Sequence, residues 1–163
     1  MIQVSVAFDG VDPAPGEVTL GAEVLERAAR AALAHAGAER YNLSLAVVSD
    51  AVLASLHDRY LDDPTETDVM SFDLSDELGG PAGEVVISLD RARRVARARG
   101  IPLAREMALY AVHGTLHLVG YDDLEPAARE RMRVAEREVL LSLGYAPDTG
   151  VHEFDERECN DAP

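Results

Sequence analysis

Four short segments of the chain carry the apolar patterns of β-strands. The first, IQVSVAF at residues 2–8, alternates apolar and polar positions, as a strand with one buried face does. The other three are LSLAVVS at 43–49, TDVMSFDL at 67–74 and EVVISL at 84–89. Residues that favour turns or loops separate these segments from their neighbours. The pattern therefore predicts a sheet of four strands.

Five other segments repeat their apolar residues with helical spacing. The predicted helices cover about 20–35, 50–61, 90–99, 102–119 and 124–143. Most of them are followed by a glycine, which is common directly after a helix, and Ser49 or Asp50 can cap the second one. The segment SDELGGPAG at 75–83 is predicted as a turn-rich connection. The fourth helix has no charged residue after Glu106, so we expect it to be buried at the centre of the fold.

The order of these elements predicts the fold class. Because helices separate two or more of the strands, the simplest architecture is α/β (α+β), a mixed four-stranded sheet covered by helices. The length of 163 residues suits one compact domain, which we place at residues 1–146. Residues 147–163 are acidic and poor in apolar side chains, so they are predicted to form a flexible tail.

Composition narrows the picture further. Hydrophobic residues make up 47% of the chain, yet there is no tryptophan, so Ala, Val and Leu must build most of the core. No apolar run approaches the roughly 20 residues that span a bilayer, and the amino terminus lacks a basic signal-peptide start. We therefore expect a cytoplasmic protein without a membrane segment. The single cysteine, Cys159, has no partner for an intramolecular disulfide.

The formal net charge of −15 at pH 7 makes the chain strongly acidic. This argues against a protein that coats nucleic acid by bulk electrostatics, because phosphate contacts need lysine or arginine. Six of the fifteen basic residues, all arginines, nevertheless lie between Arg91 and Arg105. This arginine stripe is either a solvated helix face or a surface that follows phosphates.

The segment HGTLHLVGYDD at residues 113–123 carries the candidate chemistry. On a helix, His113 and His117 lie on one face about one turn apart, so both imidazoles can point at one ion. Gly120 can end the helix and turn the chain back, which lets Asp123 supply a third ligand. Zinc accepts these ligand types, and with three of them it keeps one position for a water whose pKa it lowers toward about 7. The spacing predicts a catalytic metal centre on a zincin-like helix.

These residues also have alternative roles. The histidines can be core residues that bond to backbone or water, although two of them in one apolar helix would each need a polar partner. Asp123 can cap the last predicted helix, and the neighbouring Asp122 can serve as either cap or ligand. The spacing favours metal binding over these alternatives.

A zinc peptidase is the competing enzyme class, because the histidine spacing is also that of zincin motifs. Those peptidases need a glutamate directly after the first histidine as general base. Here that position is Gly114, which cannot transfer a proton. The peptidase therefore stays a minor alternative, and the sequence identifies no general base.

The segment also resembles the YbeY family of bacterial metal-dependent endoribonucleases, whose motif has the form HGxLHLxGYDH. HGTLHLVGYDD matches that motif at all but its last position. TDVMSF at 67–72 is similar to the family's TDVLSF, GEVVISL at 83–89 to its GDIVIS, and LLSLGY at 140–145 to its closing helix. The resemblance covers most of the chain, from about Leu43 to Tyr145.

The resemblance implies a compact α/β domain that holds one zinc ion through His113, His117 and Asp123 and cleaves single-stranded RNA. It also implies a role in ribosomal RNA processing, notably 16S rRNA 3′-end maturation in the small subunit, and in ribosome quality control. The implied partners are ribosomal RNA and the small ribosomal subunit.

Two positions depart from the family pattern. Asp123 stands in place of the third family histidine, which preserves a possible ligand but adds a negative charge that makes the metal a weaker Lewis acid. Leu61 stands where the family usually carries an arginine. Arg59 is a candidate substrate contact in its place only if the helix end there is irregular. Ser71 is a candidate phosphate contact or an ordinary strand residue.

Three functions follow from these features. The first is a zinc-dependent endoribonuclease, a hydrolase of RNA phosphodiester bonds. The second, suggested by Asp123 and Leu61, is a metal-stabilised ribosome-assembly factor with weak catalytic activity. The third is the zinc peptidase. The sequence carries no signal for an oligomeric state.

Overall fold

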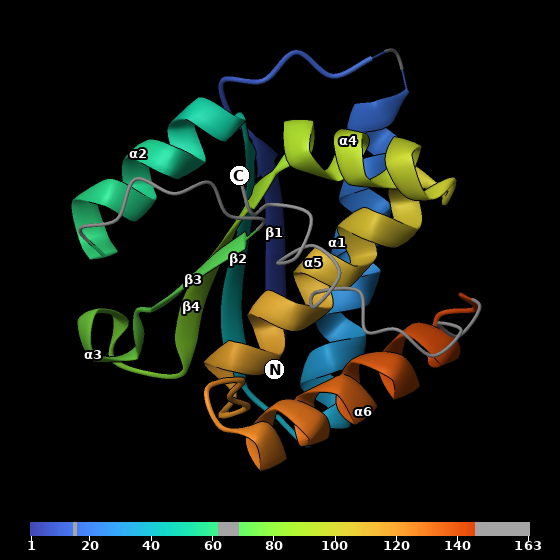
Figure 1. The fold of residues 1–163 in the computed structure, drawn as a ribbon. Coiled ribbons are helices and arrows are strands. Elements are labelled where there is room, and N and C mark those ends of the chain that lie inside the picture. Colours follow the sequence, from blue (N-terminus) through green and yellow to red (C-terminus); the bar gives the residue numbers. More distant parts are fainter. Residues whose placement is uncertain (15, 62–68, 146–163) are drawn as a thin grey trace.

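A mixed four-stranded sheet forms the centre of the computed structural model, which describes residues 1–14, 16–61 and 69–145 (Figure 1). Its strands are β1 (Ile2–Phe8), β2 (Tyr41–Val48), β3 (Val69–Asp73) and β4 (Ala82–Ser88). They lie in the order β1-β2-β4-β3. β1, β2 and β4 are parallel, and β3 runs antiparallel to β4. The predicted mixed sheet of four strands is therefore confirmed.

The helices lie close to where the apolar pattern places them. They are α1 (Glu17–His35), α2 (Asp50–Leu61), α3 (Ser75–Leu78), α4 (Leu89–Arg99), α5 (Leu103–Leu118) and α6 (Pro126–Ser142). The prediction missed the short helix α3, which lies inside the connection expected to contain turns alone. It begins where the Asp73 carboxylate accepts the N–H of Ser75 at 2.9 Å. Of the two proposed caps for α2, Ser49 takes the role, because its hydroxyl accepts the N–H of Val52 at 3.2 Å.

The two faces of the sheet are covered unequally. The larger hydrophobic core lies between one face of the sheet and α1 and α5, and α6 packs against these two helices (Figure 1). On the other face α2 covers a smaller cluster formed by Val48, Leu53, Met70 and Val86. Strand alternation explains this division, because successive side chains of β2 and β4 point to opposite faces. The larger core therefore surrounds α5.

Helix α5 is the most deeply buried helix among the described residues, and every residue from Arg105 to Leu116 is buried. It crosses β3 and β4 at Gly114, where a Cβ atom would lie 2.6 Å from Cγ1 of Val85 and 3.0 Å from Cγ2 of Val69. Only a residue without a side chain allows this approach. The expectation of a central, apolar fourth helix is confirmed.

Part of the expected organisation falls outside the described residues. The predicted acidic tail at 147–163 and Cys159 lie there, so the proposed domain limits remain a prediction. Within the ranges that the structure covers, no helix is both long and apolar enough to cross a membrane.

We predict that Gly114→Ala lowers the free energy of unfolding by about 1 to 3 kcal/mol, because the added methyl group overpacks the contact with β3 and β4. In an exposed helix the same substitution would stabilise by about 1 kcal/mol. Denaturant unfolding of the purified protein measures the difference.

Gly21→Ala in α1 is the matched control. Its new Cβ would come within 2.9 Å of only one atom, Cζ at the far end of the Phe8 ring. Since a ring edge can move, we expect little loss of stability. A Gly114→Ala protein as stable as the Gly21→Ala protein would contradict the close packing of α5.

Candidate metal centre

The end of α5 turns the chain so that Asp123 returns to the two histidines. The N–H of Tyr121 donates to the carbonyl of Leu116 at 3.0 Å, and the N–H of Gly120 donates to the carbonyl of His117 at 3.3 Å. Gly120 itself has a φ of 105°. This pair of bonds around a positive-φ glycine is a common helix ending. The structure thus places Gly120 in the role that its sequence position predicted.

Three ligand-type atoms converge at this turn. Nε2 of His117 lies 3.1 Å from Nε2 of His113. Oδ2 of Asp123 lies 3.7 Å from Nε2 of His113 and 3.6 Å from Nε2 of His117. Among the described residues, this is the group of histidine and acidic side chains identified as able to hold a metal ion.

The separations of these atoms fit a divalent ion. Ligand atoms placed tetrahedrally at about 2.0 to 2.2 Å from zinc lie about 3.3 to 3.6 Å from one another. The three observed separations, 3.1, 3.6 and 3.7 Å, lie within about 0.2 Å of that range. Two imidazole nitrogens and a carboxylate oxygen this close also repel one another unless a proton or a cation lies between them. The group is therefore suited to bind a cation.

The structure separates the roles of Asp122 and Asp123. Asp122 is exposed, and its Oδ1 accepts the N–H of Leu124 at 3.0 Å, which stabilises the turn. Asp123 points its carboxylate at both histidines instead. The capping alternative for Asp123 is wrong, because α6 begins at Pro126 with Glu125 at its N-cap. Arg129 fixes the turn further by donating from Nε to the carbonyl of Asp123 at 3.1 Å.

Glu136 is a neighbour of this group that the sequence analysis missed. Its Oε2 contacts Nδ1 of His113, on the side of the imidazole opposite Nε2. Both side chains are buried, with 3% of Glu136 and 9% of His113 exposed. The sequence did carry a signal, because Glu136 lies within the otherwise apolar buried positions Met132, Ala135, Val139 and Leu140 of α6.

The charges of the site shift two pKa values in opposite directions. Burial of His117 would lower its pKa, but the adjacent Asp123 carboxylate and the charges of Glu136 and Asp122 outweigh burial and raise it. The contact with His117 lowers the pKa of Asp123, against the opposing effect of burial. Without a metal ion, the site therefore favours a proton on His117 and an ionised Asp123.

The proposed substrate contacts differ in their surroundings. Ser71 lies beside α5, where its hydroxyl donates to the carbonyl of Gly114 at 2.8 Å. Arg59 is exposed in the last turn of α2, and the backbone stays helical through Leu61. The irregular helix end that would let Arg59 take the place of the family arginine is therefore not found there. Leu61 ends that helix, but its side chain lies outside the part of the structure described here. Of the two candidates, Ser71 is therefore the one that contacts the metal-centre helix directly.

The arginines of the arginine stripe have different surroundings in the structure. Arg91 and Arg105 are buried. Arg93 pairs with Glu17 of α1, and Arg94 pairs with the Asp50 carboxylate of α2. At least four of the six arginines are thus buried or paired within the fold, so the stripe does not form one continuous cationic surface.

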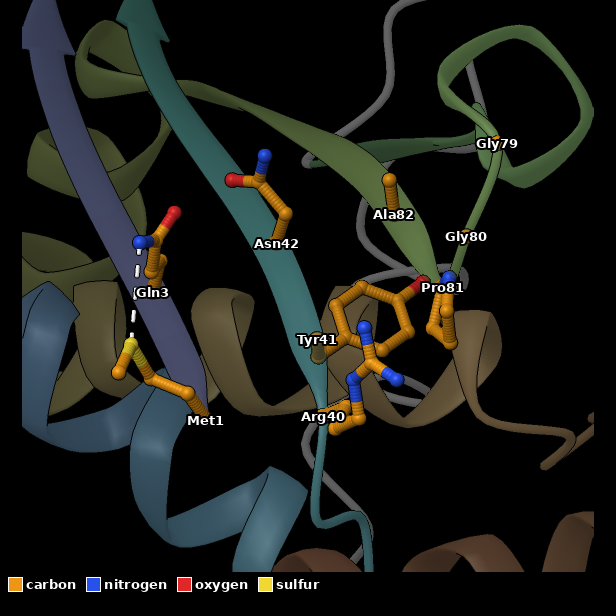
Figure 2. Close-up of a pocket in the computed structure, with 9 residues that line it drawn as sticks. All are labelled: Met1, Gln3, Arg40, Tyr41, Asn42, Gly79, Gly80, Pro81 and Ala82. Atoms are coloured by element: carbon orange, nitrogen blue, oxygen red, sulfur yellow. Dashed lines mark hydrogen bonds between the residues drawn. The ribbon is translucent and has the colours of Figure 1, made fainter.

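A separate hollow of about 300 Å³ opens at the amino ends of β1, β2 and β4 (Figure 2). Gln3, Arg40, Tyr41 and Asn42 line it together with the connection at 79–82, and no histidine or acidic residue occurs among its described lining residues. Burial and the charge of Asp73 raise the pKa of Tyr41. This composition does not offer the ligands of a metal site.

Comparison with known proteins identifies relatives of this fold and site. A family model described as Endoribonuclease YbeY matches residues 17–144. A curated protein named Endoribonuclease YbeY from Desulfitobacterium hafniense is 37% identical over 126 residues, which cover 71% of this chain and 80% of the relative. Its namesake in Mycolicibacterium smegmatis is 40% identical over 110 residues, or 60% of this chain and 61% of the relative.

The chain accounts for only part of some relatives. An Endoribonuclease YbeY from Myxococcus xanthus is 38% identical over 133 residues, which span 78% of this chain but 45% of that protein. The fold is also similar to the solution structure of a Thermotoga maritima protein, with a TM-score of 0.57 and 19% sequence identity. The match covers 98% of this chain and 93% of the Thermotoga maritima chain and so supports the fold. The family match includes the whole motif from His113 to Asp123, and the chain belongs to the YbeY endoribonuclease family.

Proposed function

We propose that this chain is a zinc-dependent endoribonuclease that cleaves single-stranded RNA. One observation carries the proposal: in a member of the YbeY family, Nε2 of His113, Nε2 of His117 and Oδ2 of Asp123 converge at the spacing that a divalent ion requires. Three protein ligands leave a coordination position open, as in catalytic rather than structural zinc sites.

The three proposed ligands differ in how far they are exposed to an approaching substrate. His113 is the inner ligand, whereas 30% of the His117 side chain and 39% of the Asp123 side chain are exposed. An RNA phosphate therefore approaches from the side of His117 and Asp123. A zinc ion bound there would activate water and stabilise charge on the scissile phosphate.

Two further residues are proposed as substrate contacts. Ser71 lies next to the metal-centre helix, where its hydroxyl donates to the carbonyl of Gly114, and it is proposed to contact a phosphate of the bound RNA. Arg59 is exposed and can contact the RNA backbone farther along the strand.

In the cell, the proposed role is ribosomal RNA processing, including 16S rRNA 3′-end maturation, and ribosome quality control. The corresponding partners are ribosomal RNA and the small ribosomal subunit in the cytoplasm. Family membership supports these assignments. Asp123 favours one alternative, a ribosome-assembly factor of weak catalytic activity, because a carboxylate ligand reduces the Lewis acidity of the ion.

We expect His117→Ala to lose zinc and to cleave single-stranded ribosomal RNA at least about 10²-fold more slowly, because an ion held by two ligands binds and polarises poorly. Asp123→His should retain zinc and cleave at least as fast as the wild type, since a neutral ligand leaves the ion a stronger Lewis acid. Metal analysis and single-turnover cleavage of a labelled RNA measure both properties.

His35→Ala is the control for the loss of a histidine, because His35 lies on α1 and pairs with Glu138 at 3.6 Å. Its zinc content and cleavage rate should match the wild type. Cleavage that persists in metal-free His117→Ala would refute the endoribonuclease mechanism. Binding to small subunits without metal-dependent cleavage would instead support the assembly factor.

We also predict a pH dependence for the contact between His117 and Asp123 in protein kept metal-free with a chelator. Because the pKa of His117 is raised, its contact with Asp123 stabilises the folded protein fully at pH values below 6.5, the ordinary pKa of histidine. This stabilisation is lost as the pH rises through the raised pKa. Because the pKa of Asp123 is lowered, the same contact stabilises the folded protein at pH values above 3.8, the ordinary pKa of aspartate. This stabilisation is lost as the pH falls through the lowered pKa.

The difference in unfolding free energy between wild type and Asp123→Asn should therefore be largest near pH 5 to 6. Because both side chains are partly exposed, we expect about 0.2 to 1 kcal/mol there. Urea unfolding across pH values measures the difference. An effect that grows steadily toward alkaline pH would contradict the assigned shifts.

A further inference from the structure

Glu136 contacts His113 but is not one of the three residues whose ligand atoms converge at the candidate metal centre. Its Oε2 meets Nδ1 of His113, while Nε2 of the same ring faces His117 and Asp123. α6 supplies Glu136 and α5 supplies His113, so the contact joins the two helices that flank the turn carrying Asp123.

The geometry restricts where His113 can carry its proton. A neutral imidazole has one N–H donor and one acceptor nitrogen, and only the acceptor can bind a metal ion. An ionised Glu136 accepts a hydrogen bond, so it favours the tautomer with the proton on Nδ1. That tautomer directs the lone pair of Nε2 toward His117 and Asp123. Histidine ligands of metal ions commonly donate their other N–H to a carboxylate in this way.

An acidic side chain at this buried position carries a cost in stability. Only 3% of the Glu136 side chain is exposed, and burying a carboxylate carries a large desolvation penalty. Apolar replacements of buried charged groups are often neutral or stabilising. A carboxylate at this position does suit a metal site, because its negative charge is opposite to that of a divalent ion.

The geometry points to Glu136 as a positioning residue of the metal centre, which holds His113 in the tautomer and ring orientation that present Nε2 to the ion. This role rests on the metal site of the proposed function. It does not require Glu136 to touch RNA. Its loss should therefore weaken metal binding before any substrate is added.

Glu136→Gln tests the inference with almost no change in volume. The glutamine amide can donate to Nδ1 and so select the tautomer with its proton on Nε2. We expect about 10- to 100-fold weaker zinc binding in a chelator competition, the usual range for such a partner. We also expect a changed His113 tautomer in ¹H–¹⁵N spectra of metal-free protein and shifted visible absorption bands of the Co²⁺ form.

Glu138→Gln is the matched control, because Glu138 lies on the same helix, 58% of its side chain is exposed, and it pairs with His35. Its zinc affinity should stay within twofold of the wild type. Glu136→Met covers the case in which Glu136→Gln folds poorly, since an apolar side chain of similar size suits the buried position. It too should bind zinc at least about 10-fold more weakly.

The outcomes separate this inference from RNA cleavage. A Glu136→Gln or Glu136→Met protein that folds and binds zinc like the wild type would overturn the role of Glu136. Wild-type protein that binds zinc but does not cleave RNA would refute the proposed activity and leave the role of Glu136 intact. Wild-type protein that binds no divalent metal would overturn both.

Discussion

The contact of α5 with β3 and β4 at Gly114 determines where the metal centre can form. A Cβ atom there would lie 2.6 Å from Val85, and the Ser71 hydroxyl holds the Gly114 carbonyl at 2.8 Å. This fixes the rotation of α5 about its axis. His113 and His117 both lie to one side of the helix face that meets the sheet, and on that side His113 contacts Glu136 of α6. The helix that forms the core therefore also orients the two candidate histidine ligands.

Local pattern predicted much of this arrangement. Helix periodicity placed α5, the i and i+4 spacing paired its histidines, and Gly120 signalled the turn that returns Asp123. Each of these features depends on residues close together in sequence. The choice between Asp122 and Asp123 was harder, because it depends on which carboxylate faces the histidines after the turn has formed.

Features that depend on packing between distant segments were not predictable from the same signals. Glu136 meets His113 across two helices, and an acidic residue in an apolar stripe does not by itself identify its partner. The arginine stripe illustrates the same limit, because Arg93 and Arg94 pair with residues of α1 and α2 that lie far away in sequence. The amino-acid composition gives the number of charged residues but does not show which of them form ion pairs in the fold.

Because these arginines pair within the fold, a metal ion bound at the candidate centre would have a larger electrostatic role. The chain has a net charge of −15, and at least four arginines of its densest basic segment are buried or paired. An RNA phosphate therefore gains little from bulk attraction and needs a local positive charge. A divalent ion held by His113, His117 and Asp123, as proposed, would supply that charge. Asp123 and Glu136 would stabilise such an ion, but their negative charges would also reduce the positive field that it presents to a phosphate. Tight metal binding and strong activation of the substrate are therefore opposing demands on this site.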